Sequence, residues 1–216
     1  NFALVGGWTL AATDDASSAI INAHVAACVA ALVWLLLERL RSGKVTATGF
    51  ASGLVAGIAG IAPAAGLVSP GGAILIGALV APVCYFALRF VRKTLAIDDS
   101  SVFALHGVGG LVGALLVAVF MGAGFGGTGY PEGGGLVSQL IAQIIGLGAV
   151  AIWSILGTLI IGYGVAVAIP MRVSPDAELR GLDVTSHGEQ AWAALAQPAP
   201  QPHAQPVVID DTPEAR

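Results

Sequence analysis

The stretch SVFALHGVGGLVGALLVAVFMGA, Ser101 to Ala123, decides the fold class of this chain. It is long enough to cross a bilayer as one helix, since about 20 apolar residues suffice. Its one titratable side chain is His106, which lies roughly 9 Å from the charged end of the segment at ~1.5 Å per residue. Hydrocarbon gives an imidazole no hydrogen-bond partner, so a histidine at this depth is a candidate functional residue. The alternative is a histidine whose ring N–H is satisfied by a neighbouring carbonyl.

The composition is that of a membrane protein. Hydrophobic residues make up 56 % of the 216 residues and charged residues 10 %, and the mean hydropathy is +0.85. These values predict an all-α, polytopic transmembrane helix bundle. Five full spans are expected, over Ala16–Leu37, Val45–Val68, Ala73–Val91, Ser101–Ala123 and Leu136–Met171. The last would be roughly 54 Å long as a helix, so it must tilt, bend or extend beyond the bilayer.

The basic residues predict which side of the membrane each loop faces. All nine Lys and Arg residues lie in Glu38–Lys44, in Arg89–Lys93 or in the tail that begins at Arg172. The alternate loops, near 14–15, 69–72 and 124–135, contain none. The positive-inside rule therefore predicts a multi-pass cell-membrane protein with a cytoplasmic tail. The few basic residues are not interleaved with aromatic ones, so no nucleic-acid partner is expected.

Glycine spacing predicts close helix packing. Gly49, Gly53 and Gly57 recur every four residues and form one small-residue face. Gly107 and Gly110 follow His106 directly, and we expect them to let another helix approach it.

The first apolar stretch, NFALVGGWTLAA, is too short to cross a bilayer before the Asp14–Asp15 pair. At ~1.5 Å per residue it would reach only about 20 Å as a helix. It is expected to be the outer part of a longer helix. We therefore expect the chain to be the C-terminal portion of a longer, transporter-like protein.

Three segments resemble the ammonium transporter (Amt/Mep/Rh) family. They are GFASGLVAGIAGIAPAAGLVSPGGAILIG (49–77), IDDSSVFALHGVGGLVG (97–113) and ELRGLDVTSHGEQAW (178–192). The resemblance extends from about Phe2 to Trp192 and corresponds to the family's late sixth through eleventh helices. It implies a trimer of eleven-helix protomers, each with two inverted five-helix repeats around a pore, that conducts ammonium or ammonia.

For His106 the resemblance implies a proton-relay role, as one of two pore histidines in ring contact. The physical case agrees, because a bare cation pays a Born penalty of order tens of kcal/mol in hydrocarbon while neutral ammonia does not. A narrow apolar pore can then exclude other cations, provided that ammonium gives up its proton before it passes. An imidazole pair offers donor and acceptor nitrogens for that transfer.

The resemblance also divides the chain. Residues 1–171 correspond to an incomplete transmembrane domain, 172–192 to a cytoplasmic signature segment and 193–216, rich in Pro, Ala and Gln, to a disordered tail. The signature residues are Gly181, Asp183, His187 and Gly188, and the resemblance implies that they couple neighbouring protomers. A PII-type nitrogen signal protein is an implied partner at this face, and the lipid bilayer surrounds the rest. No cofactor is expected.

The start of the chain departs from the family pattern WFGFNGGSTLA. Phe2 keeps an aromatic residue, but Leu4 replaces the second gating phenylalanine and Val5 replaces an asparagine. Trp8 stands where the family has a serine that helps to bind ammonium at the outer mouth. The indole could supply a cation–π contact, close the mouth by its bulk, or simply pack.

Smaller departures lie elsewhere. Ser101 and Ala104 replace an acidic residue and a glycine before His106. His24 has no counterpart in the family and is expected to bond to a neighbouring helix, although a proton-carrying role is an alternative. Asn22 matches a family asparagine and is expected to form an interhelical hydrogen bond.

Three functions are consistent with these features. The first is ammonium transport, and the second is an ammonium sensor or non-conducting relative in which Leu4 and Trp8 mark a closed pore. The third, least favoured, is a haem protein with His24 and His106 as ligands. No hydrolase, kinase or redox-enzyme motif is present, so the chain is not expected to be an enzyme.

Overall fold

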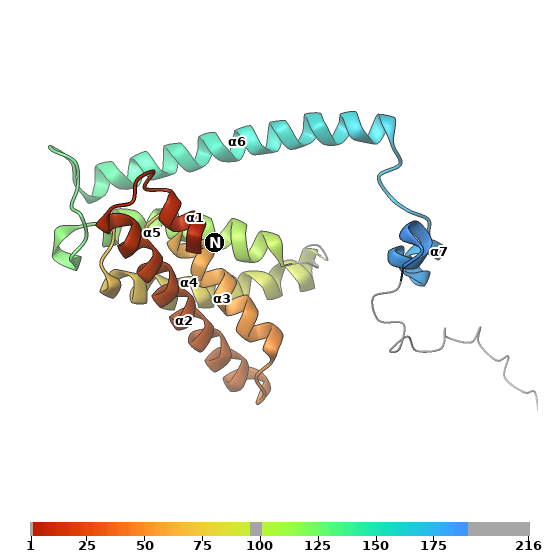
Figure 1. The fold of residues 1–216 in the computed structure, drawn as a ribbon, viewed down its shortest axis with the longest axis horizontal. Coiled ribbons are helices and arrows are strands. Elements are labelled where there is room, and N and C mark those ends of the chain that lie inside the picture. Colours follow the sequence, from red (N-terminus) through yellow and green to blue (C-terminus); the bar gives the residue numbers. More distant parts are fainter. Residues whose placement is uncertain (1, 96–100, 190–216) are drawn as a thin grey trace, which may run out of the picture. The chain divides into compact units, whose positions relative to one another are not determined.

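The computed structural model describes residues 2–95 and 101–189, and these form helices and turns with no strand (Figure 1). The α-helices are α1 Phe2–Gly7, α2 Asp14–Ser42, α3 Ala47–Ile61, α4 Pro70–Phe90, α5 Gly109–Phe120, α6 Leu136–Ala168 and α7 Pro175–Arg180. Three π-helical turns, η1 Val91–Leu95, η2 Phe103–Val108 and η4 Asp183–His187, and one 3₁₀ turn, η3 Ala123–Phe125, complete the structure. The all-α prediction is confirmed.

The chain divides into two compact units, residues 1–156 and 157–216, with the boundary inside α6. The predicted domain boundary after Met171 stays a prediction, and the predicted disordered tail, 193–216, lies outside the described residues.

Four helical segments of the described residues are long and apolar enough to cross a membrane. They are α2, Pro70–Leu95, Phe103–Phe120 and α6, which agree with four of the five predicted spans. Over the remaining predicted span, Val45–Val68, the helix is shorter than predicted, because α3 has only 15 residues and ends at Ile61, after which turns continue the segment. Ala62 keeps helical backbone angles, but Pro63 has no backbone N–H to continue the hydrogen-bond ladder, so the helix ends there and the chain turns until α4 begins.

Helices α2 and α3 make a close backbone contact. A Cβ on Gly57 would lie 2.5 Å from the carbonyl oxygen of Ala26, and one on Gly53 would lie 2.7 Å from the Cα of Ala31. Both alanines are buried on the facing side of α2. The two helices can approach this closely because α3 presents glycine at these points and α2 presents mostly alanine, with Trp34 at one end of the contact. Gly49 differs, because the carboxylate of Glu38 occupies the space that its Cβ would take.

Helices α3 and α5 also cross at glycine. A Cβ on Gly113 would collide with the carbonyl of Gly60, and one on Gly109 would lie 3.2 Å from the Sγ of Cys84. Within the described residues no other helix packs against Gly107 or Gly110, and their role in helix packing stays a prediction. A Cβ on Gly110 would meet nothing within 4 Å, and one on Gly107 would meet only Phe103 of its own turn. Gly109 and Gly113 make the contacts because they lie on the buried side of the helix.

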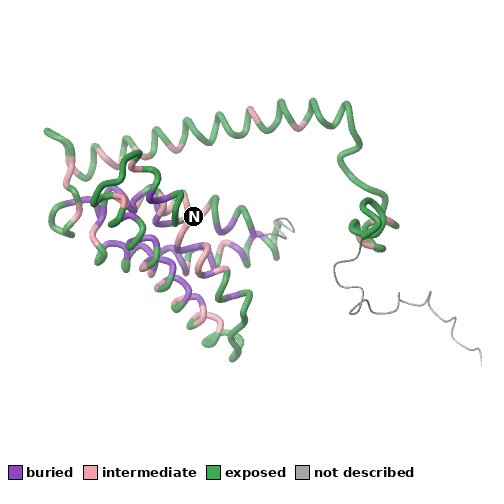
Figure 2. The backbone as a smooth tube through the Cα atoms, in the orientation of Figure 1, coloured by how far each residue is buried: buried purple, intermediate pink, exposed green. Residues whose placement is uncertain are grey.

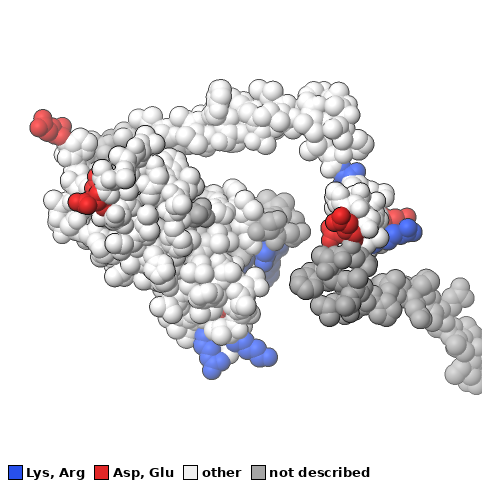
Figure 3. All heavy atoms as spheres, in the orientation of Figure 1, with Lys and Arg blue, Asp and Glu red and all other residues white. Residues whose placement is uncertain are grey.

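The loops of the first unit gather at two ends. The loop after α2 and the end of α4 line one cavity. The basic residues near these two segments are Arg39, Arg41, Lys44, Arg89, Arg92 and Lys93 (Figure 3). At the other end, Ser69 donates a 2.7 Å hydrogen bond to the carbonyl of Phe125, and Thr128 N donates a 3.0 Å bond to the carbonyl of Leu67. The distribution of Lys and Arg predicts that these two sets of loops face opposite sides of the membrane. In the structure they lie at opposite ends of the first unit.

None of the residues of α6 is buried in the described structure (Figure 2). Its 33 residues contain no Asp, Glu, Lys or Arg and only a few uncharged polar residues, so its surface is largely apolar. A helix that is apolar all round needs lipid or protein as its environment. Together with the four spans, this establishes a multi-pass membrane protein.

We expect Gly113→Ala to destabilise the protein by about 1–3 kcal/mol, because its methyl group would overlap the backbone of Gly60. Gly110→Ala, on the open side of the same helix, is the matched control and should cost less. Thermal unfolding of the purified full-length protein in detergent measures both. Equal midpoints for the two variants would contradict the α3–α5 contact.

Candidate functional site

His106 is the fourth residue of η2, the π-helical turn that precedes α5. Ala104 and Leu105 beside it are buried, and the Sγ of Cys84 lies 4.0 Å from the carbonyl of Leu105. His106 itself is exposed in the described chain. It therefore lies on the side of this segment that the other described helices leave open. π-Helical turns of this kind occur frequently at functional sites.

The side of the helix that carries His106 leads to a cavity. Gly110 and Ala114 follow His106 at intervals of four residues, which places all three along one side of the segment. Gly110 and Ala114 line a cavity of about 700 Å³. His106 thus lies one helical turn beyond the wall of this cavity, on the same side of the helix.

This outer cavity lies at the end of the unit that carries the loops without Lys or Arg. Its wall is formed by α1 and the residues after it, the start of α2, the end of α3 with the turn that follows, α5 and α6. The lining residues are Val5, Trp8, Thr9, Asp15, Ala59, Ala62, Pro63, Ala65, Gly66, Leu67, Gly110, Ala114 and Leu147. Asp15 is the one carboxylate in this lining, and Trp8 is 68 % exposed. Trp8 is therefore not a core residue of the described chain. An indole and a carboxylate on one cavity wall are groups that attract a cation.

Asn22 holds the turn that forms part of this wall. It is buried, and its Nδ2 donates 2.8 Å hydrogen bonds to the carbonyls of Ala65 and Val68. The expected hydrogen bond out of α2 is present, with its acceptors in the turn after α3 rather than in a helix. The Oδ1 of Asn22 is buried with no hydrogen-bond partner in the described structure.

Phe2 and Leu4 do not line the outer cavity. Leu4 is 60 % exposed, and the ring of Phe2 lies 5.7 Å from the ring of His24, centroid to centroid. The Nε2 of His24 lies 3.7 Å from the Sγ of Cys28. The polar partner of His24 is thus in its own helix, and not in a neighbouring helix as expected. The structure separates Phe2 from Trp8, which lines a different cavity.

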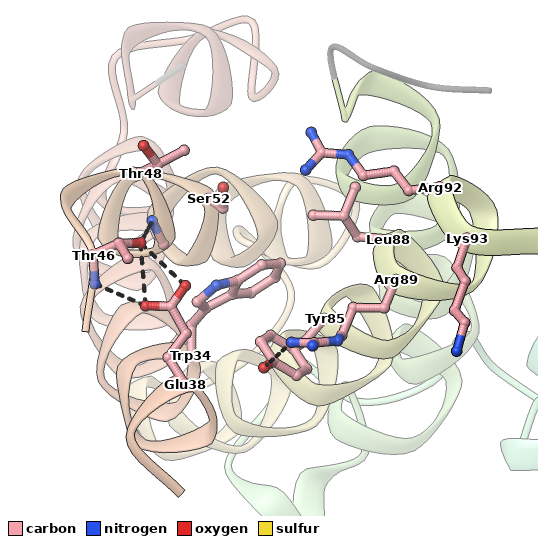
Figure 4. Close-up of a pocket in the computed structure, with 11 residues that line it drawn as sticks. Trp34, Glu38, Thr46, Thr48, Ser52, Tyr85, Leu88, Arg89, Arg92 and Lys93 are labelled. Atoms are coloured by element: carbon pink, nitrogen blue, oxygen red, sulfur yellow. Dashed lines mark hydrogen bonds between the residues drawn. The ribbon is translucent and has the colours of Figure 1, made fainter. Parts of the chain in front are cut away.

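The opposite end of the unit holds a second cavity, of about 540 Å³, that the sequence did not predict (Figure 4). On one side the carboxylate of Glu38 accepts a 2.9 Å hydrogen bond from the backbone N–H of Thr46, the N-cap of α3. Thr46 Oγ1 in turn accepts a 2.8 Å bond from Gly49 N. The Glu38 carboxylate therefore lies at the positive end of the α3 dipole, which favours its charge.

Basic side chains line the other side of this inner cavity. Arg89 donates a 2.6 Å hydrogen bond to the hydroxyl of Tyr85 (Figure 4). Arg92 donates a 2.6 Å bond to the hydroxyl of Ser101. Trp34 packs edge-on against Tyr85 with ring centroids 5.2 Å apart. The hydrogen bond to Arg92 gives Ser101 a structural role where the family has an acidic residue. The sequence showed these arginines only as markers of topology.

The signature segment lies in the second unit. Gly181 has φ +88° and Gly188 has φ +68°, a left-handed geometry that favours glycine, and they bracket η4. Glu189 N donates a 3.0 Å hydrogen bond to the carbonyl of Asp183 and closes that turn. The side chains of Asp183 and His187 are exposed in the described residues. The positive φ angles explain why glycine occupies these two positions. The coupling of neighbouring protomers by this segment stays a prediction.

The Ammonium Transporter Family model matches residues 2–192. This chain belongs to that family. It is 39 % identical to an ammonium transporter of Aquifex aeolicus over 197 residues, which are 88 % of this chain and 45 % of the relative. It is 37 % identical to the ammonium transporter Amt1 of Archaeoglobus fulgidus over 194 residues, 88 % of this chain and 48 % of that protein. The chain thus spans about half the length of the curated relatives it matches.

Solved structures show the same fold. Mep2 of Candida albicans matches with a TM-score of 0.69 and 35 % identity, over 92 % of this chain and 45 % of that one. A structure described as a sensor Amt protein matches with a TM-score of 0.72 and 29 % identity, over 84 % of this chain and 44 % of that one. The transmembrane helix bundle is therefore that of the Amt/Mep proteins.

We expect Asn22→Ala to destabilise the full-length protein by about 1–3 kcal/mol, because two buried carbonyls would lose their donor. Ser18→Ala, at an exposed position one turn earlier in the same helix, is the control and should have almost no effect. Thermal unfolding in detergent measures the difference. An Asn22 variant as stable as the Ser18 variant would show that these hydrogen bonds do not hold the turn.

Proposed function

We propose that the full-length protein transports ammonium or ammonia across the membrane along a path that passes His106. Family membership supports the substrate. The observation that carries the path is the alignment of His106 with Gly110 and Ala114, which line the outer cavity. The exposed side of this segment is where the rest of the protein closes the pore and brings a second histidine to His106.

The chemistry of this path follows from its polarity. An ammonium ion that leaves the outer cavity meets an apolar helix wall of Gly110 and Ala114, where a bare charge is costly. It transfers its proton to an imidazole nitrogen and continues as neutral ammonia. Sodium and potassium have no proton to give up and are excluded.

Trp8 and Asp15 recruit the cation at the outer mouth. Both line the outer cavity, and the indole face and the carboxylate each attract a positive charge. The cavity of about 700 Å³ beside Trp8 favours this cation–π role over closure of the mouth by the indole. Trp8 thus takes over the function of the hydroxyl that the family has at this position.

The second candidate function is an ammonium sensor or non-conducting relative. It is favoured by Leu4 and Trp8, which replace the gating phenylalanine and the binding serine, and by the similarity to the sensor Amt structure. In that case the outer cavity binds the cation and the path beyond it stays closed. Transport by the full-length protein separates the two functions.

The assembly and its partners belong to the same proposal. The protein forms a homotrimer in the cell membrane with its tail in the cytoplasm, where Gly181, Asp183, His187 and Gly188 couple the protomers. A PII-type signal protein binds at this face. The basic loops around the inner cavity support a cytoplasmic location of this end.

We expect His106→Ala to lower uptake of labelled methylammonium by about 100-fold, the typical contribution of a group that transfers a proton. The assay uses cells that lack their own ammonium transporters, with surface expression measured in parallel. His203→Ala, in the Pro/Ala/Gln-rich tail, is the matched histidine control and should transport normally. Undiminished uptake by the His106 variant would contradict the proposed path, and absence of uptake by the parent protein would favour the sensor.

We expect Trp8→Ser to raise the KM for ammonium about two- to fivefold, the equivalent of a cation–π contact of ~0.5–1 kcal/mol. Trp8→Phe keeps an aromatic face and should stay close to the parent. Ammonium-evoked currents or uptake at several concentrations measure the KM. A rise in maximal uptake in Trp8→Ser would show instead that the indole obstructs the mouth.

A further inference from the structure

A histidine and a cysteine lie side by side on α2, outside the proposed path. His24 and Cys28 are four residues apart and so lie on the same side of the helix. The Nε2 of His24 is 3.7 Å from the Sγ of Cys28, and both residues are exposed in the described chain. Their arrangement is that of two ligands on one helix turned toward a common point.

The 3.7 Å separation suits a shared metal ion. With a metal–sulfur bond of about 2.3 Å and a metal–nitrogen bond of about 2.0 Å, it corresponds to an angle near 120° at the metal. A linear arrangement needs the two atoms about 4.3 Å apart, which a small rotation of either exposed side chain provides. The pair can therefore bind an ion without any change in the backbone of α2.

The surroundings decide which metal fits. His24 lies ten residues after the start of α2, roughly 15 Å along the helix and close to the bilayer centre. It lines a cavity of about 440 Å³ with four apolar residues, Phe2, Ile20, Ile21 and Val25, and the ring of Phe2 lies over its imidazole at 5.7 Å. A net charge at this depth is costly. A thiolate with a monovalent ion is neutral, whereas a thiolate with Zn²⁺ keeps a net positive charge.

The number of available ligands also favours a monovalent ion over Zn²⁺. The described residues contain no group of three or more His, Cys, Asp or Glu side chains that could hold a metal ion. Zn²⁺ generally takes four ligands. Thiolate and imidazole are soft ligands that suit Cu(I), and a monovalent d¹⁰ ion accepts two of them.

We propose that His24 and Cys28 bind one Cu(I) or Ag(I) ion as a neutral, two-coordinate complex. The Cys28 thiol releases its proton to water as the sulfur–metal bond forms, and Nε2 of His24 donates its lone pair. The metal keeps its oxidation state. The site is independent of the transport proposal. His24 and Cys28 belong to α2, and neither of them lines the outer cavity.

The test is a titration of the purified full-length protein with Ag(I) nitrate in chloride-free buffer, followed by calorimetry and by thiolate-to-metal ultraviolet absorbance. We expect the parent to bind one more Ag(I) per chain than Cys28→Ser. His24→Leu should weaken this extra equivalent about tenfold or more, since the loss of even an outer partner of a metal ligand costs that much. His24→Met, which restores a soft ligand, should bind within a few-fold of the parent.

Two controls make the result specific. Cys84→Ser removes the other cysteine of this sequence, which is buried beside α5, and should leave the extra equivalent unchanged. Size-exclusion profiles and thermal unfolding verify that each variant is folded. An unchanged affinity in His24→Leu, an unchanged stoichiometry in Cys28→Ser, or equally tight binding of Zn²⁺ at this pair would overturn the proposal.

Discussion

The contact between Gly60 and Gly113 is the constraint on which the candidate site depends. A side chain on Gly113 would occupy the space of the Gly60 carbonyl, so α5 can reach α3 only because glycine is present there. This contact fixes the rotation of α5 about its own axis. Gly109 and Gly113 point into the bundle, while Gly110 meets no other described residue and the preceding His106 is exposed. A bulkier residue at Gly113 would move this exposed side as well as the helix.

The two ends of the first unit have different chemistry. The outer cavity combines an exposed indole with one carboxylate, whereas arginine and lysine side chains line one side of the inner cavity. A cation is attracted at the first and repelled by the basic side of the second, where the Glu38 carboxylate is held at the start of α3. In the proposed path, the apolar wall of Gly110 and Ala114 is the reason for proton transfer at His106, because a charge has no compensating partner there. The same polarity agrees with the positive-inside rule.

Much of this fold could be predicted from the sequence, because hydrophobic length and glycine spacing are local signals. Four spans were predicted, as were the small-residue face of Gly53 and Gly57 and the hydrogen bonding of Asn22 outside its own helix. The short α3 was missed because apolar residues continue through the turns after Ile61, so that hydropathy does not show where the helix ends. Glycine spacing alone did not show that Gly109 and Gly113, rather than Gly107 and Gly110, contact the other described helices, because it cannot tell the two sides of a helix apart.

The features that the sequence did not predict arise from contacts between distant segments. The position of Glu38 at Thr46 and Gly49, and the inner cavity that it lines, depend on how α2, α3 and α4 meet. The π-helical turn at Phe103–Val108 has no simple sequence signature, yet it sets the orientation of His106. The His24–Cys28 pair could have been noticed from its spacing of four, but its 3.7 Å geometry could not.

The most direct measurement for the central claim is a high-resolution cryo-electron microscopy structure of the full-length protein in lipid. We expect the His106 ring to face a narrow apolar lumen that continues from the outer cavity, with a histidine of the preceding half of the protein within hydrogen-bond distance. A His106 ring that faces lipid, or one that is separated from the lumen by a packed helix, would contradict the proposed path.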